Sequence, residues 1–197
     1  MNPTQTLPYL PLAKSFLPTR TLIRDVVLVL AGCLFVALTA QFAVGAPVPI
    51  TGQTFGVLLV GAVLGSRLGF LALVTYVLAG SLGAPFFAGG ASGIGKGLTL
   101  GYLVAFPIAA WLVGYLVERF GADRSFFKTL GMMLVANLLI YAIGVPWLGY
   151  VGFKLGIFKD WNTVIMAGMT KFLLGDFIKA VLAASLLPLA WRFVGRK

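Results

Sequence analysis

Six long runs of hydrophobic residues, separated by short polar segments, dominate the chain. The runs cover residues 26–44, 53–65, 68–83, 98–117, 129–147 and 172–191. A helix needs about 20 apolar residues to cross the hydrocarbon core of a bilayer, so these runs predict membrane-spanning helices. The second run is the shortest, and we expect a loop shielded by protein to complete its crossing. The pattern predicts an all-α integral membrane protein that is a bundle of six transmembrane helices.

Composition supports the membrane class and suggests one domain. Hydrophobic residues make up 60% of the sequence, charged residues make up 10%, and the mean hydropathy is +1.02. Six helices with short loops occupy most of the chain, so we expect a single transmembrane domain at residues 22–197. Residues 1–21 contain four prolines and no apolar core, which argues against a cleavable signal peptide. We expect this segment to be a cytoplasmic tail that is mobile or lies on the surface.

The basic residues predict the orientation in the membrane. A net charge of +10 would suggest nucleic acid in a soluble chain, but here the lysines and arginines flank the apolar runs. Ten lie on one side of the predicted bundle, namely Lys14, Arg20, Arg24, Arg67, Arg119, Arg124, Lys128, Arg192, Arg196 and Lys197. Four lie on the other side, namely Lys96, Lys154, Lys159 and Lys171. Cytoplasmic loops carry the excess of positive charge, so we expect both termini in the cytoplasm.

The last apolar run contains two opposite charges, Asp176 and Lys179. Each charge at a bilayer centre costs about 2.5–3.5 kcal/mol, and such residues usually face a partner, a cavity or a ligand. Their spacing places both on one helix face. An intrahelical salt bridge, with Lys179 reaching toward water, is the simpler alternative. The fifth run contains Asn137 and Tyr141, which we expect to form hydrogen bonds between helices.

The predicted orientation places the charged pair near the outer surface. The last helix starts at that surface, so Asp176 and Lys179 lie roughly 6–12 Å below it. The segments 45–52, 84–97 and 148–170 share the same side of the membrane. We expect these segments to close a chamber over the pair.

Several catalytic and metal-binding classes do not fit the composition. The chain has no histidine and one cysteine, Cys33, which argues against His-dependent catalytic triads and against metal sites built from His and Cys. Residues 90–97 match the spacing G-x-x-x-x-G-K, but Gly97 follows the lysine where a nucleotide-binding loop has Ser or Thr. A glycine-rich turn that approaches a ligand closely is the better interpretation of this loop.

Small residues form a smooth stripe on the first predicted helix, at Gly32, Cys33, Ala37 and Ala40. Small residues allow another helix to approach closely. We interpret the stripe as a docking surface for a partner subunit. Packing within the bundle explains it equally well.

A motif in the second run resembles a known family. Residues 47–65 read PVPITGQTFGVLLVGAVLG, and related segments follow at residues 67–69, 83–90, 101–103, 144–148 and 175–179. This series, in this order, resembles BioY, the biotin-specific S component of energy-coupling factor vitamin transporters. The chain departs from the family pattern between residues 93 and 101. It also has Ala91, followed by Ser92, where some relatives carry asparagine.

The resemblance implies a function and its partners. An S component captures biotin from outside the cell and delivers it inward across the bacterial cytoplasmic membrane. A transmembrane coupling subunit and two ATPase subunits supply the energy, so we expect no cofactor on this chain and no enzymatic activity. Biotin is then the ligand, and the lipid bilayer is the surrounding medium.

The candidate ligand contacts combine charge, polarity and aromatic surface. Biotin has a fused apolar ring body, a ureido group with N–H donors and a carbonyl acceptor, and a carboxylate. Asp176 can accept from the ureido N–H groups, and Lys179 can donate to the carbonyl or the carboxylate. Thr51 and Gln53 are candidates at the outer end of the second helix, although helix capping explains them about as well. The full candidate set is Asp176, Lys179, Tyr102, Gln53, Thr51, Phe55, Phe86, Phe87, Ala91 and Ser92.

Three alternative functions remain open at this point. An S component for another vitamin would be distinguished by ligand competition. An intramembrane enzyme would use Asp176 and Lys179 as acid and base, and would convert its substrate chemically. A passive channel fits less well, because no line of polar residues crosses the predicted bundle.

Overall fold

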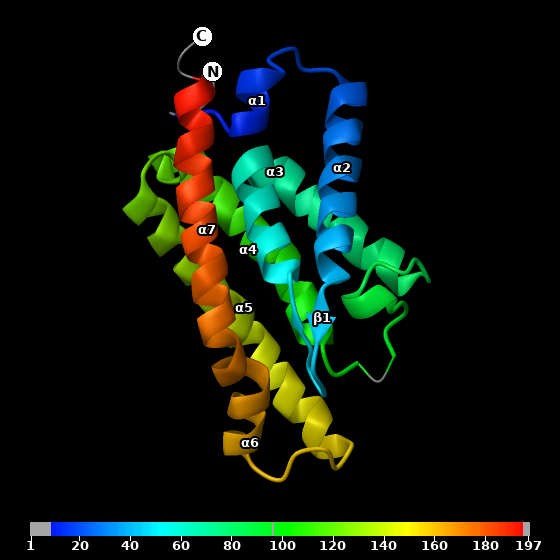
Figure 1. Cartoon of the computed structure of the whole chain (residues 1–197). Helices are drawn as coiled ribbons and strands as arrows, with labels where there is room; N and C mark the ends of the chain where they lie inside the picture. Colours follow the sequence, from blue (N-terminus) through cyan, green and yellow to red (C-terminus); the bar gives the residue numbers. More distant parts are fainter. Residues whose placement is uncertain (1–8, 96, 195–197) are drawn as a thin grey trace, which may run out of the picture.

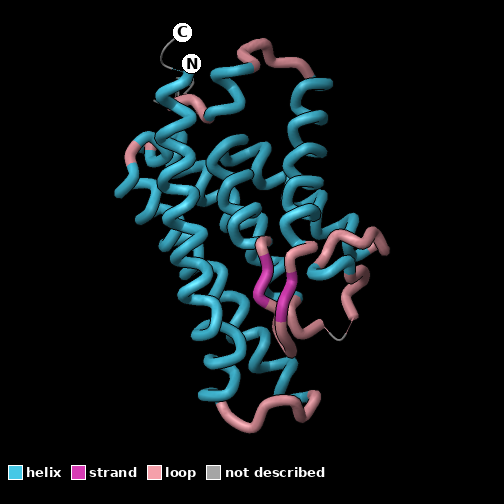
Figure 2. Tube along the Cα trace, viewed as in Figure 1, coloured by secondary structure: helices cyan, strands magenta, loops and turns pink. Residues whose placement is uncertain are grey.

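The computed structural model describes residues 9–95 and 97–194, and it is almost entirely helical (Figures 1 and 2). In chain order the elements are α1 (Leu12–Phe16), α2 (Leu22–Ala40), β1 (Ala43–Val44), β2 (Ile50–Thr51), α3 (Gln53–Ser81), the 3₁₀ turn η1 (Ala88–Gly90), α4 (Leu100–Phe120), the 3₁₀ turn η2 (Ala122–Arg124), α5 (Phe126–Lys154), α6 (Trp161–Ile165), the π-helical turn η3 (Met166–Thr170) and α7 (Lys171–Val194). The predictions made for residues 1–8 of the tail and for Lys96, Arg196 and Lys197 lie outside the described residues.

Five helical stretches of the described chain are long and apolar enough to cross a membrane. They are α2, α3, α4, α5 and the continuous stretch Trp161–Val194, which contains α6, η3 and α7. The predicted all-α membrane class agrees with this architecture. The expected runs correspond to these helices, except that the second and third runs lie within a single element, α3.

Helix α3 folds back on itself at Gly65. This glycine has φ +83° and ψ 178°, a conformation that breaks the helix and that L side chains rarely adopt. A Cβ built on Gly69 would lie 3.0 Å from the Cα of Gly61, whereas a straight helix would separate these residues by about 12 Å. Residues 53–64 and 66–81 therefore lie against each other. The two expected helices exist as two halves joined by a single glycine.

The segment after the fifth apolar run is more helical than expected. We expected a helix over residues 129–147 and then a loop to residue 170, but α5 continues to Lys154 and helix resumes at Trp161. Two glycines of α5 explain the return of the chain. A Cβ on Gly149 would lie 2.6 Å from the Trp161 ring, and a Cβ on Gly152 would lie 2.2 Å from the Phe158 ring. The loop prediction was wrong because these aromatic rings pack the segment onto α5.

The described part of the tail is docked on the bundle, at the end where both termini lie (Figure 1). Leu12 and Ala13 of α1 are buried. The Tyr9 N–H donates to the Glu118 carbonyl oxygen at 3.2 Å, and Lys14 Nζ lies 3.8 Å from Glu118 Oε1. These contacts place residues 9–16 on the surface of the bundle, against α3 and α4, in agreement with the expectation of a segment that lies on the surface.

The small-residue stripe of α2 packs inside the chain. Gly32, Cys33, Ala37 and Ala40 are all buried. A Cβ on Gly32 would lie 2.9 Å from Leu64 Cδ1 of α3. Gly32 thus packs against α3, and the burial of all four residues favours close packing within the bundle over the docking interpretation.

Candidate functional site

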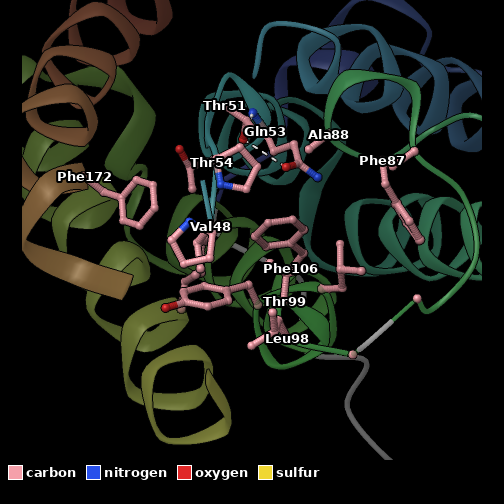
Figure 3. Close-up of a pocket in the computed structure, with 18 of the residues that line it drawn as sticks. Val48, Thr51, Gln53, Thr54, Phe87, Ala88, Leu98, Thr99, Phe106 and Phe172 are labelled. Atoms are coloured by element: carbon pink, nitrogen blue, oxygen red, sulfur yellow. Dashed lines mark hydrogen bonds between the residues drawn. The ribbon is translucent and has the colours of Figure 1, made fainter. Parts of the chain in front are cut away.

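A cavity of about 330 Å³ lies beside the β1–β2 hairpin (Figure 3). Figure 1 shows that this hairpin lies away from the termini. The size of the cavity is within the range of pockets that bind small molecules. Five parts of the chain line it: the segment from the hairpin into α3, the loop before α4, and helices α4, α5 and α7. The lining residues are Pro47, Val48, Pro49, Thr51, Gln53, Thr54, Phe87, Ala88, Ala91–Gly95, Gly97, Leu98, Thr99, Tyr102, Leu103, Phe106, Ile140, Tyr141, Phe172, Asp176 and Lys179.

The loops that cover the cavity are tied to neighbouring helices. Strands β1 and β2 pair in antiparallel register, Ala43 with Thr51, which closes the turn at residues 45–49. Lys171 Nζ donates to the Val48 carbonyl oxygen at 2.5 Å, and Trp147 Nε1 donates to the Gly97 carbonyl oxygen at 2.7 Å. Two of the three segments expected to form the chamber therefore do so, but none of the lining residues comes from residues 148–170.

Asp176 and Lys179 face this cavity and also pair with each other. Lys179 Nζ lies 2.9 Å from Asp176 Oδ1, so the intrahelical salt bridge and the placement at a cavity are both observed. Asp176 is only 4% exposed. Thr54 donates to Asp176 Oδ1 at 2.8 Å, and the hydroxyl of Tyr141 donates to Oδ2. The carboxylate is thus held by α3, α5 and its own helix.

The two charged groups differ in their remaining capacity for a ligand. The Lys179 ammonium donates to the Thr51 carbonyl oxygen at 2.6 Å, to Thr54 Oγ1 at 3.0 Å and to Asp176 Oδ1. An ammonium has three N–H donors, so all three have acceptors in this structure. Asp176 Oδ2 accepts from Tyr141 and, with two lone-pair sites, keeps one for a further donor. A ligand N–H group can bind Asp176 directly, whereas binding to Lys179 requires an exchange of partners.

Thr51 and Gln53 line the cavity and also form an internal network. Thr51 Oγ1 accepts from the Gln53 N–H at 3.2 Å and donates to Gln53 Oε1 at 2.9 Å (Figure 3). Gln53 Nε2 donates to the Tyr76 hydroxyl at 2.7 Å, which donates to the Phe86 carbonyl oxygen at 3.0 Å. This chain of hydrogen bonds joins the two halves of α3 to the loop that follows. The N-cap of α3 is Gly52, which makes no side-chain cap bond, so Thr51 does not cap the helix; it accepts from the Gln53 N–H, and both residues line the cavity.

Two of the four predicted aromatic residues, Phe87 and Tyr102, line the cavity. Phe172, which was not predicted, lies opposite Phe87 in Figure 3. The Tyr102 ring packs so closely on Gly144 that a Cβ there would lie 2.4 Å from the ring, and its hydroxyl donates to the Gly168 carbonyl oxygen at 2.8 Å. Tyr102 thus joins α4 to α5 and η3 while its ring forms part of the wall.

Phe55 and Phe86 do not line the cavity. Phe55 follows Thr54 on α3, and the rotation of about 100° per helical residue turns it toward a separate, smaller cavity. Phe86 stacks on Tyr76 with ring centroids 6.4 Å apart and an interplanar angle of 7°. Their assignment to the wall of the main cavity was therefore wrong, because side-chain direction is decided by helix phase and loop path.

The sequence reasoning missed several lining residues. Phe172 lies one helical turn before Asp176, so the spacing of four residues contained a signal for it. Tyr141 was expected to bond between helices, and its bond to Asp176 confirms this, but its place in the cavity was not foreseen. Thr54 lies inside the quoted motif, yet its contact with Asp176 joins positions 122 residues apart. Ala91 and Ser92 do line the cavity, as expected.

The arrangement suits a small molecule with an apolar body and polar ends. A buried carboxylate, an ammonium and hydroxyl groups converge on one part of a wall that is otherwise aromatic and aliphatic. Charge-assisted hydrogen bonds in such a site are stronger than neutral ones. Within residues 9–95 and 97–194, no group of three or more His, Cys, Asp or Glu side chains is placed to hold a metal ion.

Comparison with known proteins gives consistent results. The model of the BioY family matches residues 10–196. The probable biotin transporter BioY of Pyrococcus horikoshii is 41% identical over 157 residues, which cover 76% of this chain and 87% of the relative. The biotin transporter BioY of Rhizobium etli is 36% identical over 148 residues, covering 71% and 76%. The chain also superposes on the crystal structure of the S-component for biotin from an ECF-type ABC transporter, with a TM-score of 0.75 and 22% identity. The superposition covers 88% of this chain and 95% of that chain, so the two share a fold.

Proposed function

The chain belongs to the BioY family, and from this membership we propose that it is the biotin-binding S component of an energy-coupling factor transporter. It captures biotin from outside the cell and delivers it inward. The observation that carries the proposal is the buried Asp176–Lys179 pair facing a cavity of about 330 Å³. The chain is a transporter subunit and not an enzyme, so these groups hold the ligand and return it unchanged.

The cavity wall matches the chemistry of biotin. A ureido N–H group donates to the open position on Asp176 Oδ2. The ureido carbonyl or the carboxylate accepts from Lys179 after the ammonium releases the Thr51 carbonyl oxygen or Thr54 Oγ1. Phe87, Tyr102 and Phe172 provide apolar surface for the fused rings. Gln53 and Thr51 are polar contacts of the same pocket.

The proposed topology has six membrane segments with both termini in the cytoplasm. The fold-back at Gly65 supports the count, because residues 53–64 and 66–81 are separate helical halves of α3. The excess of basic residues on the side of the termini supports the orientation. The ligand cavity at the other end of the bundle then faces outward. In this arrangement residues 1–21 form a cytoplasmic tail and residues 22–197 form one transmembrane domain in the bacterial cytoplasmic membrane.

The proposed partners are a transmembrane coupling subunit and two ATPase subunits. The fold shared with an S-component of an ECF-type ABC transporter supports this assembly. The glycine-rich loop at residues 90–97 lacks the Ser or Thr of a nucleotide-binding loop, so we assign ATP hydrolysis to the partners.

Calorimetric titration of the detergent-purified chain with biotin tests the ligand. We expect tight binding by the chain and a loss of affinity in Lys179→Ala, provided that the variant has the circular dichroism spectrum of the parent. Absence of heat with biotin would refute the ligand, and binding of another vitamin in its place would identify a different S component. Recovery of chemically changed biotin would refute the assignment as a transporter subunit.

A further inference from the structure

A second, much smaller cavity lies on the other side of Lys179. Its volume is about 10 Å³, and Thr54 and Lys179 line both cavities. Its other lining residues come from three helices. They are Phe55 and Leu58 of α3, Met133 and Asn137 of α5, which precede Tyr141, and Ala180 and Ala183 of α7, which follow Lys179. The start of α5 and the end of α7 lie toward the termini, so the small cavity is on that side of Lys179 (Figure 1). Thr54 and Lys179 form the partition between the two cavities.

The small cavity contains a polar group without a partner. Asn137 is 5% exposed, and its Oδ1 atom is buried with no hydrogen-bond donor among the described residues. Burying an amide oxygen without a hydrogen bond destabilises a fold, so such atoms are rare and call for an explanation. Asn137 lies one helical turn before Tyr141, whose hydroxyl donates to Asp176. Asn137 therefore lies on the same face of α5 as Tyr141, and it lines the small cavity together with Thr54 and Lys179.

Ligand binding changes the number of acceptors available to Lys179. All three N–H groups of the ammonium have acceptors, and one of these is Asp176 Oδ1, which Thr54 also uses. A ureido group has two N–H donors, so when one takes the open position on Asp176 Oδ2, the second binds Oδ1 and displaces the ammonium from that oxygen. One Lys179 N–H then needs a new acceptor, because an unpaired N–H on a buried cation is costly.

We propose that Asn137 is a positioning residue for Lys179, whose Oδ1 accepts the N–H that the ligand displaces from Asp176. The bond is made directly or through one water molecule, because the small cavity is close to the size that a single water needs. This inference rests on the proposed function. It accounts for a buried amide oxygen that has no donor among the described residues and that belongs to a residue sharing a cavity with Lys179.

The test compares Asn137→Leu with Asn137→Asp in biotin titrations of the full chain in detergent. Asn137→Leu removes the acceptor and should weaken biotin binding by about tenfold or more, because buried hydrogen bonds to charged groups are among the stronger ones. Asn137→Asp keeps an oxygen acceptor beside the ammonium and should retain most of the affinity. Met133→Leu changes an apolar wall of the same cavity and is the matched control, for which parental affinity is expected.

Two further readouts separate positioning from a structural role. Without biotin, Asn137→Leu should have a thermal midpoint equal to or above that of the parent, because it removes an unpaired polar group. In a Lys179→Met background, Asn137→Leu should cause no further loss of affinity. Parental affinity in Asn137→Leu, or an equal loss with and without Lys179, would overturn the inference while leaving the proposed function intact. Failure of the unsubstituted chain to bind biotin would overturn both.

Discussion

Replacement of Asp176 by asparagine removes one charge and retains the shape of the side chain. The amide oxygen can keep the two bonds that Oδ1 accepts, from Thr54 at 2.8 Å and from Lys179 at 2.9 Å. The amide nitrogen then occupies the place of Oδ2, and the Tyr141 hydroxyl can turn to accept from it. The fold therefore keeps its hydrogen-bond partners. The variant lacks only the negative charge and the open acceptor position on Oδ2.

The expected loss of biotin affinity follows from that one position. A hydrogen bond to a charged group contributes about 1.5–3 kcal/mol, and each 1.4 kcal/mol is about a factor of ten, so binding should weaken about 10- to 150-fold. Breaking a buried ion pair usually destabilises a protein by about 3–5 kcal/mol. We expect a smaller loss of stability here, because Lys179 keeps its bonds to the Thr51 carbonyl oxygen and to Thr54.

Titration calorimetry in detergent measures this loss, with Asp123→Asn as the matched control. Asp123 is also a buried aspartate, but it lies in η2 at the end of the bundle that carries the termini, where its Oδ2 accepts from Trp191 Nε1 at 2.5 Å. Asp123→Asn should bind biotin as the parent does. Parental affinity in a folded Asp176→Asn variant would refute the role of the carboxylate as ligand acceptor. A similar loss in both variants would point to a general effect on the fold.

Three further predictions concern packing and electrostatics. Gly61→Ala should lower the thermal midpoint, because the added Cβ would lie 2.5 Å from the Ala110 carbonyl oxygen. Gly131→Ala is the control, because a Cβ there has no neighbour within 4 Å, and equal midpoints in the two variants would contradict the tight contact. Tyr102→Phe should lower the free energy of unfolding by about 1 kcal/mol in chemical denaturation, because it removes a buried hydrogen bond to the backbone of η3. Burial raises the pKa of Asp123, so the folded state takes up a proton at a higher pH than the unfolded state. The thermal midpoint should therefore rise as the pH is lowered through the pKa that Asp123 has in the folded state, and should stop rising below the pKa that it has in the unfolded state. Asp123→Asn should remove this rise.

The sequence by itself determined the class of the protein and the main residues of the site. The length of the apolar runs predicted a helical membrane protein, because the bilayer thickness sets the length of a spanning helix. The spacing of Asp176 and Lys179 predicted that they share a face, since this depends only on the helical repeat. The motif at residues 47–65 identified the family because it is specific as a string of residues.

Only the tertiary structure decided which side chains meet. The fold-back at Gly65 brings Gly69 against Gly61, and it divides α3 into two halves that correspond to the two expected helices. Phe55 and Phe86 turn away from the cavity because of helix phase and loop path.

The partners of the charged pair were beyond the reach of the sequence for the same reason. Thr54 and Asp176 are 122 positions apart, and Lys179 and Thr51 are 128 apart. Apolar periodicity is a local property of the chain, whereas these contacts arise only when α3, α5 and α7 pack together. The sequence therefore specified which groups can bind a ligand, and the packing of helices decided which of them are free to do so.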